Sequence, residues 1–104
     1  MRGDVHRLRP PRDARAGEQR SARYAVVLQA DDLLLSTVLV APTSRSARPQ
    51  VFRPTITVRD EQTQVLVEQT TAVSLQRLGE FVGHVSHGEL VGIEMSLRLA
   101  LQLE

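Results

Sequence analysis

The sequence predicts a small, mainly β protein of the α+β class, with five or six short antiparallel strands and one C-terminal helix. Two continuous apolar runs, Ala25 to Leu28 and Val38 to Ala41, are as long as strands and rich in β-branched residues. Such runs are typical of strands that are buried on both faces. Near the C-terminus, Ser86 and Glu89 have the spacing of a capping box, which predicts the start of a helix.

Six segments have the composition of short strands. They lie at about residues 3–8, 22–29, 36–41, 51–58, 63–70 and 80–85. Residues 42–48 are polar and turn-like, and residues 74–78 are expected to form one helical turn. Because proline cannot donate to a strand ladder, Pro54 indicates that the fourth strand lies at an edge of the sheet or bulges there.

The C-terminal helix is expected to run to about Gln102 and has two apolar stripes at helical spacing. The first stripe consists of Leu90, Ile93, Leu97, Ala100 and Leu101. We expect it to cover the sheet. The second stripe consists of Val91, Met95 and Leu99. It has no evident partner within the chain and indicates a homodimer, although a helix wedged into its own barrel is an equal alternative.

Length and composition restrict the function classes. With 104 residues and 41% hydrophobic content, we expect one domain, residues 1–104, with a single core. The absence of cysteine excludes disulfides and thiolate chemistry. No apolar run approaches the roughly 18–20 residues that span a bilayer, and the N-terminus lacks an apolar signal core, so we expect a cytoplasmic protein without a membrane partner.

Positive charge is concentrated in the first half of the chain. Residues 1–53 contain ten arginines against five acidic residues, a formal charge of +5, whereas residues 54–104 contain three against seven, a charge of −4. Residues 9–22 form a predicted basic loop, in which Pro10, Pro11 and Gly17 exclude regular structure. This asymmetry favours contact with phosphates or an acidic partner, and the alternative for the loop is a solvated segment without function.

Arg23, Thr43 and Ser44 are the candidate site residues that burial does not explain. If the two apolar runs pair as antiparallel neighbours, the start of the first lies beside the end of the second, and Arg23 comes close to Thr43. A guanidinium beside a hydroxyl suits an oxyanion or phosphate site. The alternative is a surface cation and a turn residue.

Other chemistries have little support in the sequence. His84 and His87 are three residues apart without a further ligand nearby, so incidental surface histidines are favoured over a metal site. The motifs of P-loops, dinucleotide-binding folds and serine hydrolases are absent, and no cofactor is expected. RNA strand scission is compatible with arginine and hydroxyl groups, because the neighbouring 2′-hydroxyl of the substrate is the nucleophile.

Several short motifs, in their order and spacing, resemble the MazF/PemK toxin family over nearly the whole chain. In the first half they are Met1-Arg2-Gly3-Asp4-Val5, Gly17-Glu18-Gln19, Arg23 with Ala25-Val26-Val27-Leu28-Gln29, and Val40-Ala41-Pro42-Thr43-Ser44. In the second half they are Leu66-Val67-Glu68-Gln69, Arg77-Leu78-Gly79, Val82-Gly83-His84-Val85-Ser86, and Glu89-Leu90 with the Leu-rich segment that follows.

The resemblance implies an SH3-like barrel homodimer that cleaves single-stranded RNA (an mRNA, an rRNA or a tRNA) at short sequences. Cleavage would need no metal and would leave a 2′,3′-cyclic phosphate and a 5′-hydroxyl. The resemblance also implies inhibition by a cognate antitoxin whose acidic tail lies across the RNA groove. A non-catalytic toxin on the same fold, such as a DNA gyrase inhibitor, and a non-toxic binding module are the alternatives; retention of both Arg23 and Thr43 favours catalysis.

By position, Arg23 and Thr43 take the roles of the catalytic arginine and threonine of the family. The residues expected to bind RNA are Glu18, Gln19, Tyr24, Ser44, Gln69 and His6. Tyr24 replaces the usual proline of the family, and its ring could stack on a base. His6 replaces an aromatic residue and is either a packing residue or an additional proton donor. Because arginine essentially never deprotonates, we expect Arg23 to stabilise charge, with protons moved by His6, a carboxylate or water.

Overall fold

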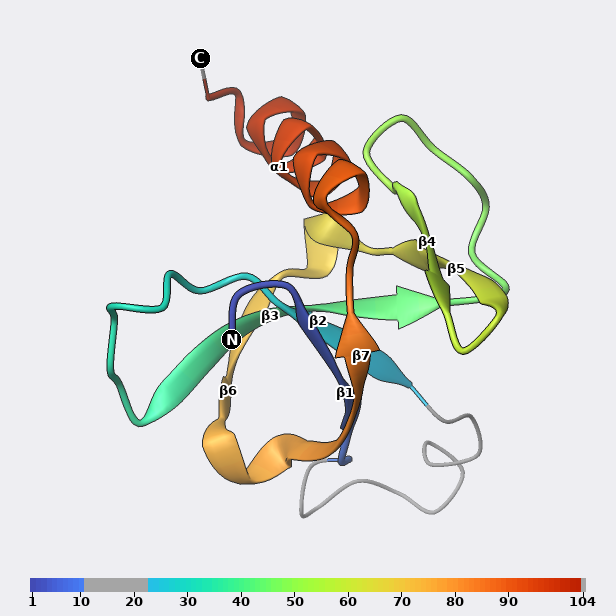
Figure 1. Ribbon diagram of the computed structural model, residues 1–104. Helices are drawn as coiled ribbons and strands as arrows, with labels where there is room; N and C mark the ends of the chain where they lie inside the picture. The colour runs from blue at the N-terminus through green and yellow to red at the C-terminus, as the bar shows by residue number, and fades with distance from the viewer. Residues whose placement is uncertain (11–22, 104) are drawn as a thin grey trace.

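The computed structural model of the protein describes residues 1–10 and 23–103, and its elements are shown in Figure 1. The strands are β1 (Asp4–Leu8), β2 (Tyr24–Val27), β3 (Thr37–Ser44), β4 (Thr55–Val58), β5 (Glu61–Val65), β6 (Thr71–Ser74) and β7 (Leu78–His84). The helical elements of these described residues are two single 3-10 turns, η2 (Val67–Gln69) and η3 (Leu75–Arg77), and the helix α1 (His87–Leu101).

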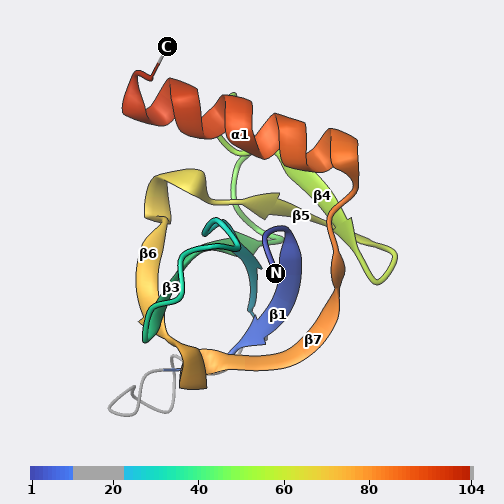
Figure 2. The same cartoon turned by 60° about the vertical axis from the view of Figure 1, so that its left-hand side comes forward.

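The strands form one antiparallel sheet in the order β4-β5-β3-β2-β1-β7, with β6 paired to β3. The sheet curls, so that β6, β3, β1 and β7 lie around a ring and α1 lies across one side of it (Figure 2). This arrangement confirms the predicted class: a mainly β protein with a curled antiparallel sheet and one C-terminal helix. The edge position of β4, directly after Pro54, is also confirmed.

The described residues contain seven strands rather than the five or six predicted, because β6 (71–74) lies where no strand was expected, and the strand expected at 63–70 ends at Val65. Thr43 of β3 pairs with Val65, and Val40 pairs with Thr71. The three residue steps from Val40 to Thr43 along β3 therefore face the six steps from Val65 to Thr71 along the partner segment. The surplus of three residues forms η2, which separates β5 from β6.

The boundaries of two predicted strands were wrong. We expected the chain to turn after Ala41, but β3 continues to Ser44, with Pro42 paired to Ala25 of β2. Pro42 still contributes its carbonyl, which accepts a hydrogen bond from Leu66 N at 2.9 Å. In contrast, the expected strand at 51–58 is regular only from Thr55, after the proline.

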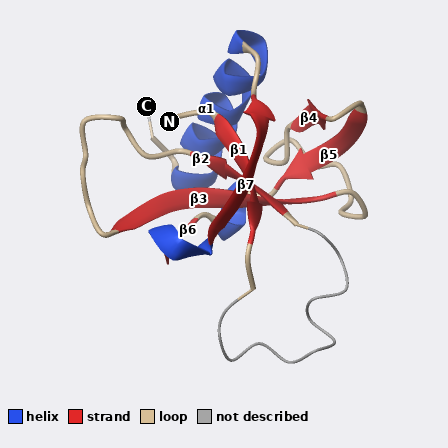
Figure 3. Ribbon diagram, turned by 60° about the horizontal axis from the view of Figure 1, so that its bottom comes forward, coloured by secondary structure: helices blue, strands red, loops and turns tan. Residues whose placement is uncertain are grey.

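Two clusters of apolar side chains pack on opposite faces of the sheet. On one face, Val26 of β2 packs with Val5 of β1 and with Ile93 of α1; Figure 3 shows α1 on this side of the strands. On the other face, Ala25 and Val27 pack with residues of β3 and β6. The prediction that β2 is buried on both faces is therefore confirmed. Because side chains alternate along a strand, this burial also fixes the faces on which Arg23 and Tyr24 lie at the start of β2.

The predicted capping box is present at the start of α1. The Ser86 hydroxyl accepts a hydrogen bond from Glu89 N at 3.0 Å, and the Glu89 carboxylate accepts one from Ser86 N at 2.8 Å. The other oxygen of the Glu89 carboxylate accepts a hydrogen bond from Thr57 N at 2.8 Å, which connects the helix to the edge strand β4.

The first apolar stripe of α1 covers the sheet only in part. Ile93 is fully buried, and Leu90 and Leu97 pack against the core, but Ala100 and Leu101 are exposed because they lie at the C-terminal end of the helix. The second stripe, Val91, Met95 and Leu99, is exposed along the helix. Within the described residues, no helix combines the length and the apolar character that a bilayer-spanning segment requires.

Candidate functional site

A pocket of about 280 Å³ opens where the start of β2 meets the ends of β3 and β5. It is lined by Arg23, Tyr24, Thr43, Ser44, Arg45, Ser46 and Thr63. The antiparallel registers create it: Ala25 pairs with Pro42, and Thr43 pairs with Val65. Residues that are far apart in the sequence thus present their polar side chains at one end of the sheet.

Arg23 and Thr43 line this pocket together, so the predicted approach of the two residues is confirmed. Thr43 is only 3% exposed, and its hydroxyl donates a hydrogen bond to the Tyr24 carbonyl at 3.3 Å. The Arg23 carbonyl accepts a hydrogen bond from Leu8 N at 2.9 Å, which fixes its backbone against β1. The Arg23 guanidinium makes no hydrogen bond or ion pair with the described residues.

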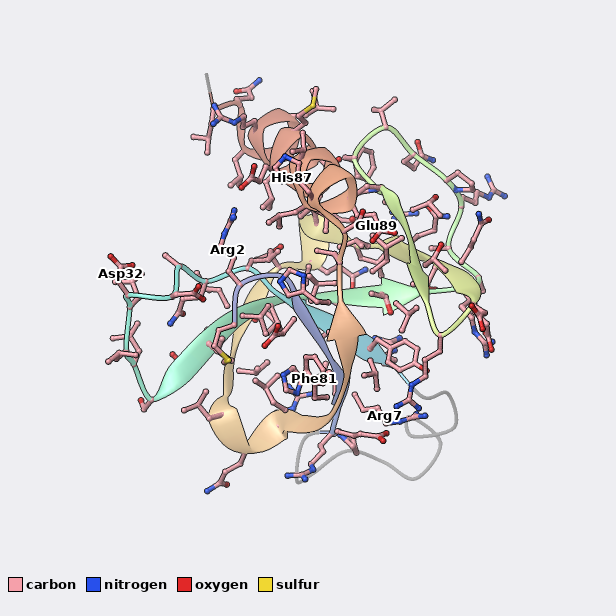
Figure 4. All side chains as sticks on the ribbon, in the orientation of Figure 1. Arg2, Arg7, Asp32, Phe81, His87 and Glu89 are labelled. Atoms are coloured by element: carbon pink, nitrogen blue, oxygen red, sulfur yellow. The ribbon has the colours of Figure 1, made fainter. Side chains whose placement is uncertain are left out.

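Tyr24 forms a half-buried wall of the pocket and packs against the core. The Arg7 guanidinium lies 5.4 Å from the centroid of its ring, a cation–π contact. Arg7 Nε in turn donates a hydrogen bond to Glu80 at 3.0 Å, and Arg59 donates one to the same carboxylate at 3.3 Å. These two hydrogen bonds, with that from Arg7 the stronger, hold the pKa of Glu80 below its ordinary value. Figure 4 labels Arg7, which is paired with Tyr24 at this end of the sheet.

Ser44 lines the pocket, but its hydroxyl also stabilises the turn that follows β3. The Ser44 oxygen accepts hydrogen bonds from Ser46 N at 3.3 Å and from Ala47 N at 3.1 Å. The next residue, Arg45, forms an ion pair with Glu61 at the start of β5. The turn therefore brings a second guanidinium to the rim of the pocket.

His6 does not line the pocket, because the alternation of side chains along β1 directs it to the other face of the sheet. It pairs with Ala25, which belongs to the opposite apolar cluster from Val5 and Val26. His6 Nδ1 lies 3.1 Å from the Gly79 carbonyl, and its ring makes an edge contact with Phe81 at a centroid distance of 5.6 Å. Packing against β7 is thus the observed arrangement of the His6 ring.

The other predicted RNA-binding residues lie elsewhere. Gln69 is exposed in η2 and does not line the pocket. Glu18 and Gln19 fall outside the described residues, as do residues 11–22 of the predicted basic loop.

Sequence reasoning missed three pocket residues: Arg45, Ser46 and Thr63. Thr63 was detectable, because it precedes Val65 by two positions and therefore shares its buried face in an extended strand. Arg45 and Ser46 carry no comparable signal. Their positions depend on the turn after β3, whose start was predicted too early.

The described part of the pocket lining combines two guanidinium groups with the hydroxyls of two threonines and two serines and contains no carboxylate or imidazole. Guanidinium groups bind oxyanions through paired hydrogen bonds, and hydroxyls can donate to the same oxygens. Within residues 1–10 and 23–103 there is also no cluster of three side chains suited to holding a metal ion. The chemistry of the lining therefore suits a phosphate or another oxyanion.

The curled β sheet, the C-terminal helix and the pocket of guanidinium and hydroxyl groups make this a small α+β protein with a candidate oxyanion-binding site. Its sequence identifies the family: residues 1–101 match the profile of the PemK-like, MazF-like toxins of type II toxin–antitoxin systems. The chain therefore belongs to this toxin family. It is also 35% identical over 104 residues to a candidate toxin of Mycobacterium tuberculosis, Rv3098A, with 99% of this chain and 98% of that protein covered.

Solved structures of similar fold support this assignment. The M. tuberculosis toxin MazF-mt6 superposes with a TM-score of 0.79 at 16% identity, covering 97% of this chain and 98% of that one. An endoribonuclease in complex with its cognate antitoxin, from a mycobacterial species, superposes with a TM-score of 0.81 at 17% identity, covering 100% and 96%. At these identities the superpositions establish the common fold.

Proposed function

We propose that this toxin is an endoribonuclease that cleaves single-stranded RNA at short specific sequences. The observation that carries the proposal is the meeting of Arg23 and Thr43 in a pocket of guanidinium and hydroxyl groups. The fold shared with a solved endoribonuclease supports it. In this proposal Arg23 and Thr43 contact the reacting phosphate, and Tyr24 and Ser44 contribute to RNA binding from the same pocket.

The proposed reaction uses the 2′-hydroxyl of the RNA as the nucleophile. Its oxygen forms a bond to phosphorus while the bond between phosphorus and the 5′-oxygen breaks, which leaves a 2′,3′-cyclic phosphate and a 5′-hydroxyl. The proton of the 2′-hydroxyl is removed, and one proton is delivered to the departing 5′-oxygen. Arg23 and the Thr43 hydroxyl stabilise the negative charge that develops on the phosphoryl oxygens.

The reaction is proposed to need no metal, because the protein can supply the positive charge from arginine. The described lining has no carboxylates of the kind that Mg²⁺ prefers as ligands. Arg23 is unsuited to remove a proton, since guanidinium stays charged in proteins. With His6 facing the opposite side of the sheet, the proposed base is a water molecule or a carboxylate from outside the described pocket lining.

We further propose that the toxin acts as a homodimer and is inhibited by a cognate antitoxin with an acidic tail. The exposed side chains of Met95 and Leu99 border an apolar groove of about 690 Å³, which suits a second copy of the chain. The arginines of residues 1–53 suit an acidic peptide as well as RNA. The solved endoribonuclease with its cognate antitoxin supports this choice of partner.

Incubation with a long in vitro transcript in EDTA tests the proposal. We expect discrete cleavage products whose upstream fragments end in a cyclic phosphate and whose downstream fragments accept a phosphate at the 5′-hydroxyl. Cleavage that stops in EDTA would contradict metal independence. Intact RNA together with inhibition of DNA gyrase would favour the non-catalytic toxin.

A further inference from the structure

Thr63 is a pocket residue with an unusual environment. Its side chain is 2% exposed, and its hydroxyl has no hydrogen-bond partner within the described residues. It lines the same pocket as Arg23 and Thr43. Because Thr63 pairs with Ile56 on one side of β5, and Val65 beyond it pairs with Thr43, the neighbouring strands hold its backbone in place.

A buried hydroxyl without a partner is unfavourable, because it loses its hydrogen bonds to water and gains none in return. Native structures therefore pair nearly all such groups, and an exception calls for a specific explanation. In the described part of the chain, His6 Nε2 and Gln64 Oε1 are also buried without partners, but neither residue lines the pocket. Thr63 alone combines an unpaired buried atom with a position in the pocket wall.

The other threonine and serine hydroxyls of the pocket are already occupied. The Thr43 hydroxyl donates to the Tyr24 carbonyl, and those of Ser44 and Ser46 lie 3.3 Å apart. Of these four hydroxyls, that of Thr63 is the one whose hydrogen-bonding capacity is unused by the described residues. It lines the same pocket as Arg23 and Arg45.

We propose that the Thr63 hydroxyl donates a hydrogen bond to a non-bridging phosphate oxygen of the RNA, which makes Thr63 a further substrate-binding residue. This inference rests on the proposed endoribonuclease function. The Arg23 guanidinium, which no described residue neutralises, attracts the anion, and the buried hydroxyl completes its coordination from within the pocket. Because Thr63 is almost fully buried, a phosphate that stays on the rim cannot reach it. The phosphate must enter the pocket.

Three variants isolate the hydroxyl. Thr63→Val removes it and preserves the branched shape, and Thr63→Ser keeps it. Thr57→Val is the matched control, because Thr57 lies on the neighbouring strand β4 with an exposed side chain. The probe is a single-stranded oligonucleotide library with 2′-fluoro sugars, which binds without being cleaved because it lacks the attacking hydroxyl.

We expect Thr63→Val to weaken binding of this library by about tenfold or more, the effect of losing a hydrogen bond to a charged group. Thr63→Ser and Thr57→Val should bind like the wild type. The melting temperature of Thr63→Val should equal or exceed that of the wild type, since the valine leaves no unpaired hydroxyl. A lower melting temperature with unchanged binding would overturn the inference, because the hydroxyl would then have a structural role.

A second measurement does not depend on RNA. Titration with inorganic phosphate should shift the NMR resonances of Thr63 and Arg23 in the wild type, with a dissociation constant about tenfold weaker in Thr63→Val. Equal phosphate and oligonucleotide binding by the two proteins would overturn the inference. If phosphate binding depends on Thr63 but the wild type cleaves no RNA, the oxyanion role of Thr63 is upheld and the proposed endoribonuclease function fails.

Discussion

Arg23 supplies the pocket with a positive charge that no described residue neutralises. Replacement of Arg23 by Lys or Ala should lower RNA cleavage on the order of 100- to 1,000-fold, because a charge-stabilising donor is lost and Lys lacks the planar fork that binds two oxygens. The fold should persist, since Arg23 is held through its backbone carbonyl. Initial rates and thermal melting measure both effects.

The control for Arg23 is Arg48→Lys. Arg48 is an exposed arginine outside the pocket, whose carbonyl accepts a hydrogen bond from Arg53. This variant should cleave at the wild-type rate. Near-normal cleavage by Arg23→Lys would contradict the assignment of Arg23 to the reacting phosphate.

Thr43 differs from Thr63 because its hydroxyl is bonded within the chain. Thr43→Val should lower cleavage by at least about tenfold and also lower the unfolding free energy by about 1 kcal/mol, since the bond to the Tyr24 carbonyl is lost. Thr43→Ser should retain much of the activity. Loss of stability with full cleavage would show that Thr43 is only structural.

Glu68 makes the stability of the protein sensitive to acid. Arg53 donates two hydrogen bonds to one Glu68 oxygen, at 2.6 and 2.9 Å, and this contact holds the pKa of Glu68 below its ordinary value. The resulting stabilisation is present above the ordinary pKa of a glutamate. It is lost as the pH falls through the lower pKa of the folded state, because the unfolded chain binds the proton more readily.

Urea denaturation at a series of pH values measures this effect. The wild type should lose about 1 kcal/mol or less through this pair between pH values of about 5 and 3, as expected for a partly exposed ion pair. Glu68→Gln should have a flatter dependence in the same range. Identical curves for the two proteins would show that the pair contributes nothing.

At the residue scale, the sequence was sufficient to predict that Arg23 and Thr43 lie close together. In two adjacent antiparallel strands, the start of one necessarily lies beside the end of the other. The sequence was insufficient to place His6, since it does not show on which face of the sheet the pocket opens. The burial of Thr63 could be inferred from its spacing to Val65, but its position in the pocket depends on the pairing of β5 with β3, which the sequence does not reveal.

At the scale of elements, the sequence predicted the helix start, the strand β2 that is buried on both faces and the edge strand β4, whereas β3, also expected to be buried on both faces, leaves Leu39 43% exposed. Their signals are local: a capping box, continuous apolar runs and a proline. The end of β5 at Val65 was not predicted, because the residues of η2 that follow include the buried Val67 and continue the apolar pattern, and β6 was not predicted at all. The three extra residues of η2 become apparent only from the register in which β5 and β6 pair with β3.

The second stripe of α1 gives a prediction about assembly. Met95 is 65% exposed at an apolar groove, so Met95→Glu should weaken a homodimer at this face at least about tenfold by placing an unpaired charge in the interface. Ala100→Glu is the control, because Ala100 is exposed on the same helix outside the groove. Light scattering that finds an unchanged Met95→Glu dimer would exclude this interface.

At the scale of the whole molecule, the charge difference between residues 1–53 and 54–104 predicts that the arginines of residues 1–53 attract both proposed partners. RNA and an acidic antitoxin peptide should compete for the toxin, and both should bind more weakly as salt increases, because counterions screen the arginines and are released on binding. Fluorescence anisotropy with labelled RNA measures this. An acidic peptide that binds without displacing RNA would contradict a shared site.

The pairing of β1 with β7 also has a consequence for how the protein is made. During synthesis β1 emerges long before its partner β7, which ends at His84, and α1 follows after Val85 and Ser86. A ribosome that stops before Leu78 therefore releases a fragment in which one side of β1 has unpaired N–H and C=O groups. Such an edge pairs with other chains. Interrupted synthesis should therefore yield fragments that are prone to aggregation rather than a smaller folded protein.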